Sequence, residues 1–151
     1  EFVTRKISYA VARIKYNLQK ELYLGNIKTK RDWGHAKDYV EAMWKMLQKK
    51  KPDDYVISTG KQYSVKQFIN LTAKKLGIIL YWEKKGKLNF ARNKVNNQIV
   101  VRQDKKYFRA AEVEDLLGDS SKAKRLLNWK PKRNINKLIE EMIVEEMRDL
   151  N

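Results

Sequence analysis

The sequence predicts a mixed α/β fold with helices in the majority and several short strands. Long stretches carry apolar residues at spacings of three and four, which places them on one face of a helix. Between them lie short β-branched or apolar runs, some of which end at glycine, as strands followed by turns do. With 151 residues, 42% of them hydrophobic, the chain has enough apolar side chains for one domain or part of one.

Two helices are expected in the first third of the chain. The first covers residues 2–18. No Ser, Thr, Asp or Asn precedes it as a cap, so we expect the chain to open inside a larger fold. The second covers about residues 35–50 and ends before Pro52. Its predicted buried face consists of Ala36, Tyr39, Val40, Met43, Trp44 and Leu47.

Three further helices are predicted by their capping residues. Ser64 caps the first of them, which ends at Gly77 because glycine readily adopts the left-handed conformation that closes a helix. Asp119 caps a short helix that ends at Leu127. Asn134 caps the last helix, with Ile135, Leu138, Ile139, Met142, Ile143 and Leu150 facing inward.

Short strands are expected at Glu21–Leu24, Tyr55–Ser58, 78–82 and 99–101. The second of these is the best candidate, because it is rich in β-branched and aromatic residues and is followed closely by a glycine. Residues 83–98 hold one glycine, four asparagines and few apolar residues, which favours an exposed loop.

The composition excludes several kinds of chemistry. Cysteine is absent and there is one histidine, so a disulfide framework, a cysteine-ligated zinc site and a thiolate nucleophile are excluded. The reducing cytosol is therefore the default compartment, and the location we expect is cytoplasmic. No apolar run approaches the ~20 residues that a membrane-spanning helix needs, and we expect no membrane partner.

The chain carries 34 Lys and Arg against 18 Asp and Glu, a formal net charge of +16. Such a charge suggests nucleic acid as a partner, since clustered cations bind phosphates. The cations are nevertheless scattered along the whole chain with acidic residues among them. We therefore favour a solvated basic surface, and a basic nucleic-acid-binding module is kept as an alternative of a different class.

No catalytic or dinucleotide-binding motif stands out. Tyr16 with Lys20 and Tyr81 with Lys85 match the Tyr-x-x-x-Lys spacing of short-chain dehydrogenases, but in a lysine-rich chain chance accounts for both pairs. No Gly-x-Gly-x-x-Gly string follows a strand. His35 stands at a helix start, where we interpret it as a capping or packing group.

Arg31 and Arg109 are more informative than the lysines because each lies beside aromatic residues, and arginine can bind an oxyanion through two donors. Glu112 follows Arg109 by three residues, so the two would face the same way in a helical turn. A cation for phosphate beside a carboxylate for sugar hydroxyls suits a nucleotide-sugar pocket. On residue types alone, an ordinary salt bridge is the favoured interpretation.

Five strings occur in order along the chain: Phe2–Lys6, Tyr23–Asn26, Lys30–Val40, Tyr63–Val65 and Tyr107–Val113. Together they resemble the C-terminal part of the GDP-mannose 4,6-dehydratase family, which belongs to the extended short-chain dehydrogenases/reductases. The strings Asp119–Ala123 and Leu127–Pro131 are similar to those of many nucleotide-sugar enzymes of that group. The resemblance runs from residue 1 to about residue 150.

The resemblance implies a lyase with a Rossmann-type domain that binds NADP, made mostly of residues absent from this chain, and a substrate-binding portion formed by residues 1–151. It implies conversion of GDP-mannose to GDP-4-keto-6-deoxymannose: oxidation at C4 by hydride transfer to NADP, loss of water across C5 and C6, and return of the hydride to C6. The catalytic and NADP-binding residues would precede residue 1. We therefore assign none here and expect this chain to be inactive alone. A homo-oligomer is also implied, and another nucleotide-sugar epimerase or reductase is the alternative within the same class.

The resemblance also implies which residues bind the substrate. Val3 and Lys6 match positions that contact the GDP moiety, Arg31 and Arg109 match arginines on the diphosphate, and Glu112 matches a carboxylate on the ribose. We expect the two arginines and the glutamate to converge on one hollow. Losing either arginine should weaken binding severely, since remote binding energy of this kind positions a sugar for reaction.

Two departures from the family pattern stand out. Ala110 replaces a proline, which leaves that turn less restricted, and Asn128 replaces a glycine, a mild change because asparagine tolerates the left-handed conformation. If a Rossmann portion is missing, residues 2–18, 35–50 and Tyr55–Ser58 should present apolar surface that the remaining elements cannot bury.

Overall fold

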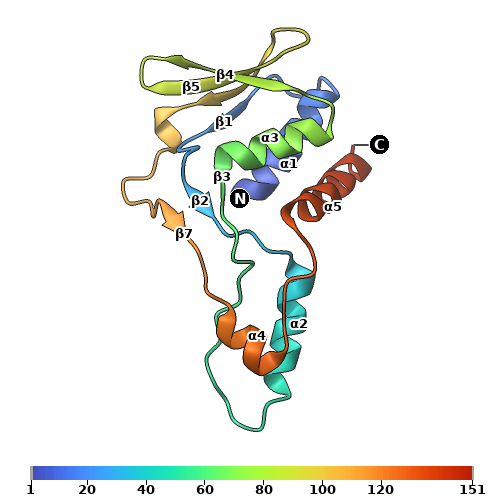
Figure 1. Ribbon diagram of the computed structural model, residues 1–151. Helices are drawn as coiled ribbons and strands as arrows, with labels where there is room; N and C mark the ends of the chain where they lie inside the picture. Colours follow the sequence, from blue (N-terminus) through green and yellow to red (C-terminus); the bar gives the residue numbers. More distant parts are fainter. Residues whose placement is uncertain (1, 151) are drawn as a thin grey trace. The chain divides into compact units, whose positions relative to one another are not determined.

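The computed structural model describes residues 2–150 and has the expected α/β character. These residues form two compact units (Figure 1). Unit one holds the chain up to Thr29, then Ser64–Glu114 and the chain from Ile139 onward; unit two holds Lys30–Tyr63 and Asp115–Leu138. Within the described residues no helix is both long and apolar enough to cross a membrane.

Unit one contains a four-stranded sheet in the order β1-β6-β5-β4. β1 and β6 are parallel, with Leu22 opposite Val101, whereas the other neighbours are antiparallel. Leu22, Leu24 and Val101 are buried, so this end of the sheet contributes to the core. The strands are β1 (Leu22–Leu24), β4 (Leu80–Lys85), β5 (Leu88–Asn93) and β6 (Ile99–Gln103).

Two helices, α1 (Val3–Lys15) and α3 (Val65–Lys75), lie side by side and pack against this sheet (Figure 1). Their three-and-four spacing forms the core as predicted, with Ile7, Val11 and Phe68 fully buried. The predicted cap of α3 is confirmed: the side chains of Ser64 and Gln67 bond reciprocally to each other's backbone N–H groups.

The last helix, α5 (Ile135–Arg148), is also capped as predicted, because the side chain of Asn134 accepts the backbone N–H of Lys137. Its first turn belongs to unit two and its remainder to unit one. In unit one, buried Glu146 accepts a hydrogen bond from the hydroxyl of Ser8 at 3.1 Å. This bond ties α5 to α1.

The expected loop at residues 83–98 is wrong, because most of it belongs to a β-hairpin formed by β4 and β5. Gly86, at φ +61°, occupies the first position of the two-residue turn, where glycine is favoured because φ is positive. Almost every residue of both strands is partly exposed. A strand that is half exposed on both faces lacks the apolar alternation by which strands are recognised.

Unit two is built around α2 (Ala36–Leu47) and α4 (Ser121–Leu127). A small three-stranded sheet accompanies these helices, with its strands in the order β3-β2-β7. The strands are β2 (Lys30–Arg31), β3 (Tyr63–Ser64) and β7 (Asp115–Leu116), and β2 is parallel to β7. Its core consists of Ala42, Ala123, Leu127 and Trp129, with Tyr39, Met46, Tyr55 and Ile57 packed against it.

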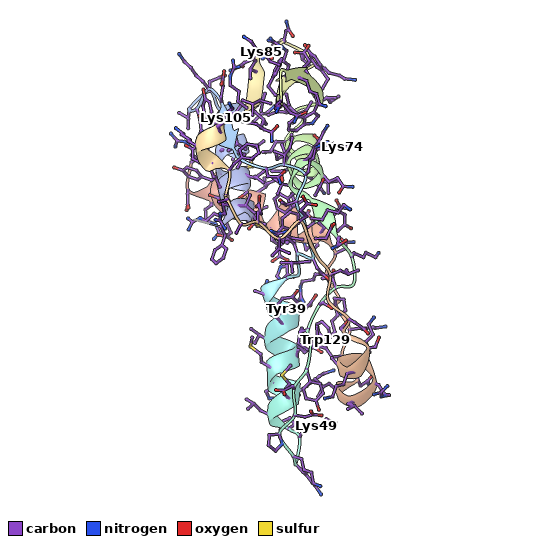
Figure 2. All side chains as sticks on the ribbon, turned by 90° about the vertical axis from the view of Figure 1, so that its left-hand side faces the viewer. Tyr39, Lys49, Lys74, Lys85, Lys105 and Trp129 are labelled. Atoms are coloured by element: carbon purple, nitrogen blue, oxygen red, sulfur yellow. The ribbon has the colours of Figure 1, made fainter. Side chains whose placement is uncertain are left out.

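The predicted buried face of α2 is wrong. Val40, Met43, Trp44 and Leu47 are all exposed, between 58% and 82%, and Ala36 is exposed as well. The helix instead buries Asp38 and Ala42. Only Tyr39 of the predicted face points inward, and its ring lies 6.4 Å from that of Trp129, centroid to centroid (Figure 2).

These exposed residues follow one another at helical spacing, so α2 presents an apolar stripe of Val40, Met43, Trp44 and Leu47. The expected apolar surface is thus confirmed for α2. For residues 2–18 the prediction is only partly confirmed: Ile7, Val11 and Ile14 are enclosed within unit one, whereas Phe2 and Leu18, just outside α1, are exposed.

The predicted strand at Tyr55–Ser58 does not form, because these residues belong to neither a strand nor a helix. Tyr55 and Ile57 face the core of unit two, Val56 is 54% exposed, and Ser58 is buried. The hydroxyl of Ser58 donates to the carbonyl of Gly118 at 2.8 Å. The alternation predicted for a strand is therefore present, and Val56 supplies part of the expected exposed apolar surface.

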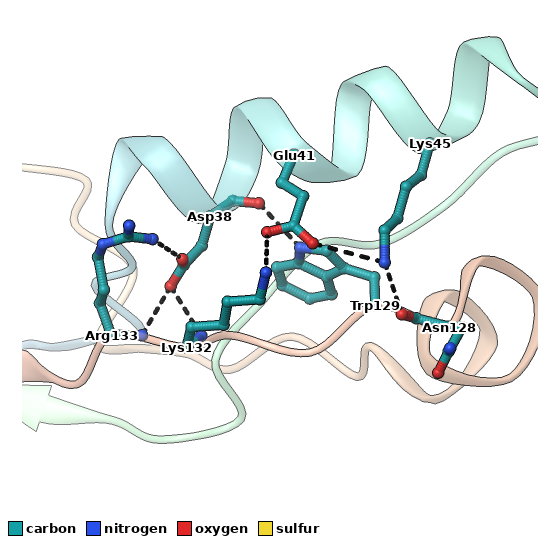
Figure 3. A network of polar contacts seen from close by, with 7 residues as sticks. All are labelled: Asp38, Glu41, Lys45, Asn128, Trp129, Lys132 and Arg133. Atoms are coloured by element: carbon teal, nitrogen blue, oxygen red, sulfur yellow. Dashed lines mark hydrogen bonds and ion pairs between the residues drawn. The ribbon is translucent and has the colours of Figure 1, made fainter.

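A polar network holds α2 to residues 128–133 (Figure 3). The carboxylate of Asp38 accepts the backbone N–H groups of Lys132 at 3.0 Å and Arg133 at 2.9 Å. The carbonyl of Asp38 accepts the indole N–H of Trp129 at 2.8 Å. Asn128, at φ +46°, adopts the left-handed conformation that the sequence allows for it, and its carbonyl accepts from Lys45.

Candidate functional site

Arg31 lies on β2 in unit two, where it pairs with Leu116 of β7. Its side chain is half-buried, and its guanidinium donates to the carbonyl of Lys30 at 2.7 Å. The Arg31 side chain therefore already has partners within the described part of the chain.

Asp32, next in the chain, fixes the backbone that faces this strand. Its carboxylate accepts the backbone N–H groups of Thr59 at 3.0 Å and Gly60 at 2.8 Å, and also the Thr59 hydroxyl. Gly60 has φ +73°, a conformation that suits glycine. Asp32 is thus a structural residue that holds the 59–60 turn beside Arg31.

The residues after Asp32 start α2. The Nδ1 of His35 accepts the backbone N–H of Lys37 at 3.2 Å, so the prediction that His35 caps or packs is confirmed. Gly34 is packed against Tyr39: a β-carbon at Gly34 would lie 2.3 Å from the Tyr39 hydroxyl oxygen. Residues 32–35 are therefore held firmly against α2, the helix that follows them.

Val3 and Lys6 lie one turn apart on α1, in unit one, and both are half-buried. The ammonium of Lys6 lies 4.1 Å from the ring centroid of Tyr107, well within the range of a cation–π contact. Tyr107 is the last residue of the 3₁₀ helix η1 (Lys105–Tyr107). This contact joins α1 to the segment that carries Arg109 and Glu112.

The helical turn that would align Arg109 with Glu112 does not form, because η1 ends at Tyr107 and residues 108–114 are irregular. Arg109 is exposed and Glu112 is half-buried. Between residues 2 and 150, the structure shows no side-chain hydrogen bond or ion pair for either residue. The ordinary salt bridge favoured on residue types is therefore not formed.

The structure thus gathers four of the five predicted residues in unit one: Val3 and Lys6 on α1, and Arg109 and Glu112 after η1. Arg31 belongs to unit two. Sequence reasoning missed Tyr107 as the link between the two groups. In the sequence, Tyr107 is recognisable only as an aromatic residue two positions before Arg109. Its contact with Lys6 is visible only in the folded structure.

A separate hollow of about 300 Å³ lies at the end of the sheet in unit one. None of the five predicted residues lines it, and its arginine, Arg102, is occupied by a bidentate pair with Glu21 at 2.6 and 3.2 Å. Burial works to raise the pKa of Glu21, but hydrogen bonds from Arg102 and Tyr23 outweigh it, so the pKa lies below its usual value. This pair secures β1 to β6. The hollow is lined by Lys85, Leu88, Asn89, Phe90, Arg102 and Gln103.

No cluster of three or more His, Asp or Glu side chains able to hold a metal ion occurs within the described residues. The residues predicted from the sequence to bind the substrate are two arginines, one lysine, one glutamate and one apolar residue; four of them lie in unit one, and Arg31 lies in unit two. Arginine, lysine and glutamate side chains can each bind part of an anionic ligand that also carries hydroxyl groups.

The fold is shared with parts of larger proteins of known structure. The chain superimposes on RMD from Pseudomonas aeruginosa complexed with NADPH with a TM-score of 0.78 at 20% identity, covering 98% of this chain and 43% of the other. For dTDP-glucose 4,6-dehydratase from Bacillus anthracis in complex with NAD the TM-score is 0.68 at 19% identity, covering 95% and 39%. At these identities the likeness shows the fold alone, the α/β fold that forms part of these Rossmann-type proteins.

The sequence comparisons are more specific. The family model for GDP-mannose 4,6 dehydratase matches residues 1–142. GDP-mannose 4,6-dehydratase of Vibrio cholerae is 48% identical over 158 residues, and that of Homo sapiens is 47% identical over 150. The chain belongs to the GDP-mannose 4,6-dehydratase family. The alignments cover 97% of this chain but only 42% and 40% of the two relatives, so the chain spans about two fifths of their length.

Proposed function

We propose that this chain is the GDP-sugar-binding portion of a GDP-mannose 4,6-dehydratase, an NADP-dependent lyase that converts GDP-mannose to GDP-4-keto-6-deoxymannose. Residues 1–151 then form the substrate-binding part, and a Rossmann-type portion lies outside this chain. Val3, Lys6, Arg31, Arg109 and Glu112 bind the nucleotide. Family membership over residues 1–142 supports the choice of nucleotide.

The observation that carries the proposal is the contact between Lys6 and Tyr107. Its 4.1 Å distance links α1, with Val3, to the segment with Arg109 and Glu112, so residues far apart in the sequence share one neighbourhood. Lys6 and Arg109 supply positive charge for a diphosphate, and Glu112 can accept hydrogen bonds from ribose hydroxyls.

Arg31 is proposed as the second diphosphate ligand. Its position on a β strand, followed by an aspartate that binds three donors of Thr59 and Gly60, keeps the backbone fixed. A fixed backbone lowers the entropy that a long side chain loses on binding. An arginine can then hold a phosphate through two N–H groups at once.

The residues of this chain do not fit a dinucleotide site, so NADP is proposed to be held by the portion outside it. Gly25, Gly34 and Gly118 are packed against protein groups. The other three glycines, Gly60, Gly77 and Gly86, are turn residues at positive φ. None of the six opens a glycine-rich turn between a strand and a helix, the arrangement that binds a pyrophosphate.

The exposed apolar stripe of α2 supports the proposal that the protein has a second portion outside this chain. Exposed stripes of this size in a folded chain are typical of surfaces that another protein segment covers. We propose that the Rossmann-type portion covers it. The cytoplasmic location and the homo-oligomer implied by the resemblance are proposed for the full-length protein.

Calorimetric titration with GDP tests the proposal. We expect binding to the wild-type chain, and a loss of at least tenfold in affinity in Arg31→Ala and Arg109→Ala, since each removes a charged contact to phosphate. Arg125→Ala is the matched control, because Arg125 is an exposed arginine on α4. Absence of GDP binding, or an equal effect of all three substitutions, would contradict the proposal.

Competing ligands separate the alternatives. Preference for UDP or dTDP over GDP favours another nucleotide-sugar epimerase or reductase. Tight and steeply salt-dependent binding of RNA or DNA without affinity for GDP favours the nucleic-acid alternative, because releasing counterions from many phosphates makes affinity fall steeply with salt.

A further inference from the structure

Tyr107 contacts two lysines from different parts of unit one. The Lys6 ammonium on α1 lies 4.1 Å from the ring centroid, and the Lys106 ammonium lies 4.8 Å from it. Tyr107 is 41% exposed, so it is not a core residue. Two cations that belong to, or lie beside, the proposed nucleotide site therefore contact this ring.

The backbone of Tyr107 is fixed independently of its ring. A β-carbon at Gly25 would lie 2.1 Å from the Tyr107 carbonyl oxygen, so the two backbones touch where β1 ends. The backbone N–H of Asp104 donates to the carbonyl of Leu24 at 2.9 Å. The carboxylate of Asp104 in turn caps η1 by accepting the N–H of Lys106 at 3.0 Å. This anchoring sets the point from which the chain proceeds to Arg109.

We propose that Tyr107 is a positioning residue of the nucleotide site: its ring holds the Lys6 ammonium in place, and its anchored backbone sets the start of the Phe108–Glu112 segment. The inference rests on the proposed function. A free lysine side chain samples many rotamers, and ordering it on binding costs affinity. The ring reduces that cost by keeping the ammonium near the site before the ligand arrives.

The contact between Lys6 and Tyr107 is also weak enough for Lys6 to exchange it for a contact with the ligand. A cation–π contact at a half-exposed ring is weaker than a hydrogen bond between an ammonium and a phosphate. Lys6 can therefore turn from the ring to a diphosphate without a large loss. Tyr107 itself needs no contact with the ligand, and its hydroxyl plays no part in this role.

The test compares Tyr107→Leu with Tyr107→Phe by GDP calorimetry and by NMR of the Lys6 ε-methylene protons. We expect the Leu variant to bind GDP about fivefold more weakly and to lose the ring-current shift of Lys6, whereas the Phe variant keeps both within about twofold. The Phe variant retains the ring, so it separates ring loss from misfolding.

Two controls sharpen the result. Tyr9→Leu removes another half-exposed tyrosine beside a cation, Arg13, and we expect unchanged GDP affinity. In a double-mutant cycle, Lys6→Met combined with Tyr107→Leu should bind GDP no more weakly than Lys6→Met alone, because both act through the same ammonium.

The outcomes are distinguishable. If the wild-type chain binds GDP and Tyr107→Leu binds it equally well, the positioning role is overturned and the proposed function stands. If Phe and Leu variants are equally impaired, the hydroxyl rather than the ring matters, and the role is again overturned. If the wild-type chain fails to bind GDP, the proposed function and this inference both fall.

Discussion

The guanidinium of Arg133 pairs with the carboxylate of Asp38, which is only 1% exposed (Figure 3). Arg133 also donates its backbone N–H to the same carboxylate at 2.9 Å. A buried carboxylate is stable only when such donors satisfy it. The pair therefore fixes the start of α2 to the segment that leads into α5.

We expect Asp38→Asn to lower the free energy of unfolding by about 3 kcal/mol, because removing one charge of a buried ion pair leaves the other charge without its partner. Urea denaturation measures the change. Asp53→Asn is the control: Asp53 pairs with Lys122 on the exposed surface, and its loss should cost at most about 0.5 kcal/mol. Equal effects of the two substitutions would contradict the structural role of Asp38.

The carboxylate of Asp38 should also make the free energy of unfolding depend on pH. Burial works to raise the pKa of Asp38, but hydrogen bonds from Arg133 and Lys132 outweigh it and hold the pKa below its ordinary value of 3.8. The unfolded chain then takes up this proton more readily than the folded chain, so protonation favours unfolding. The stabilisation is fully present above pH 3.8 and is lost as the pH falls through the lower folded value.

Urea denaturation from pH 7 to pH 2 checks this dependence. The difference in unfolding free energy between wild type and Asp38→Asn should be constant near neutral pH and should shrink below pH 3.8. A difference that grows as the pH falls would mean that the pKa is raised instead.

Gly25→Ala should be costly although Gly25 does not have a positive φ. The new β-carbon would lie 2.1 Å from the carbonyl oxygen of Tyr107, so one backbone must move. We expect a loss of about 2 kcal/mol in unfolding free energy, as for other overpacked sites. Gly86→Ala, where no atom lies within 4 Å but φ is +61°, should cost only about 1 kcal/mol.

Asp32→Ala should loosen the 59–60 turn because three donors of Thr59 and Gly60 lose their acceptor. We expect a loss of about 2 kcal/mol in unfolding free energy, measured in urea. The substitution should also weaken GDP binding through the neighbouring Arg31. A variant with full stability and full GDP affinity would show that Asp32 has neither effect.

The apolar stripe of α2 gives a prediction about solubility. Leu47→Lys should change the stability of this chain by less than about 0.5 kcal/mol, since Leu47 is 82% exposed, and should reduce its tendency to associate. Light scattering and urea denaturation measure the two quantities. In a full-length protein whose Rossmann-type portion covers the stripe, the same substitution should be strongly destabilising.

The features that the sequence predicted well are local. The side chain of Ser64 bonds to a backbone group three residues away, and Gly77 adopts its left-handed conformation at the end of the same helix. Both depend on nearest neighbours along the chain, so residue type is sufficient to find them. The core positions of α1 follow from its spacing in the same way.

The errors concern distant partners. The spacing in α2 correctly identifies an apolar stripe, but it cannot show that Trp129 packs on a different face of that helix. The hairpin of β4 and β5 was missed because its side chains are half exposed on both faces. In the candidate site, residue types suggested Arg31 and Arg109, whereas Tyr107 becomes meaningful only when the fold brings it to Lys6.

The parallel pairing of Leu22 with Val101 also governs how the chain can be made. During synthesis β1 leaves the ribosome before β6 and remains without this neighbour until β6 has followed. An unpaired strand edge is a template for aggregation. Nascent chains that stall between these two strands are therefore the species that we expect chaperones to bind.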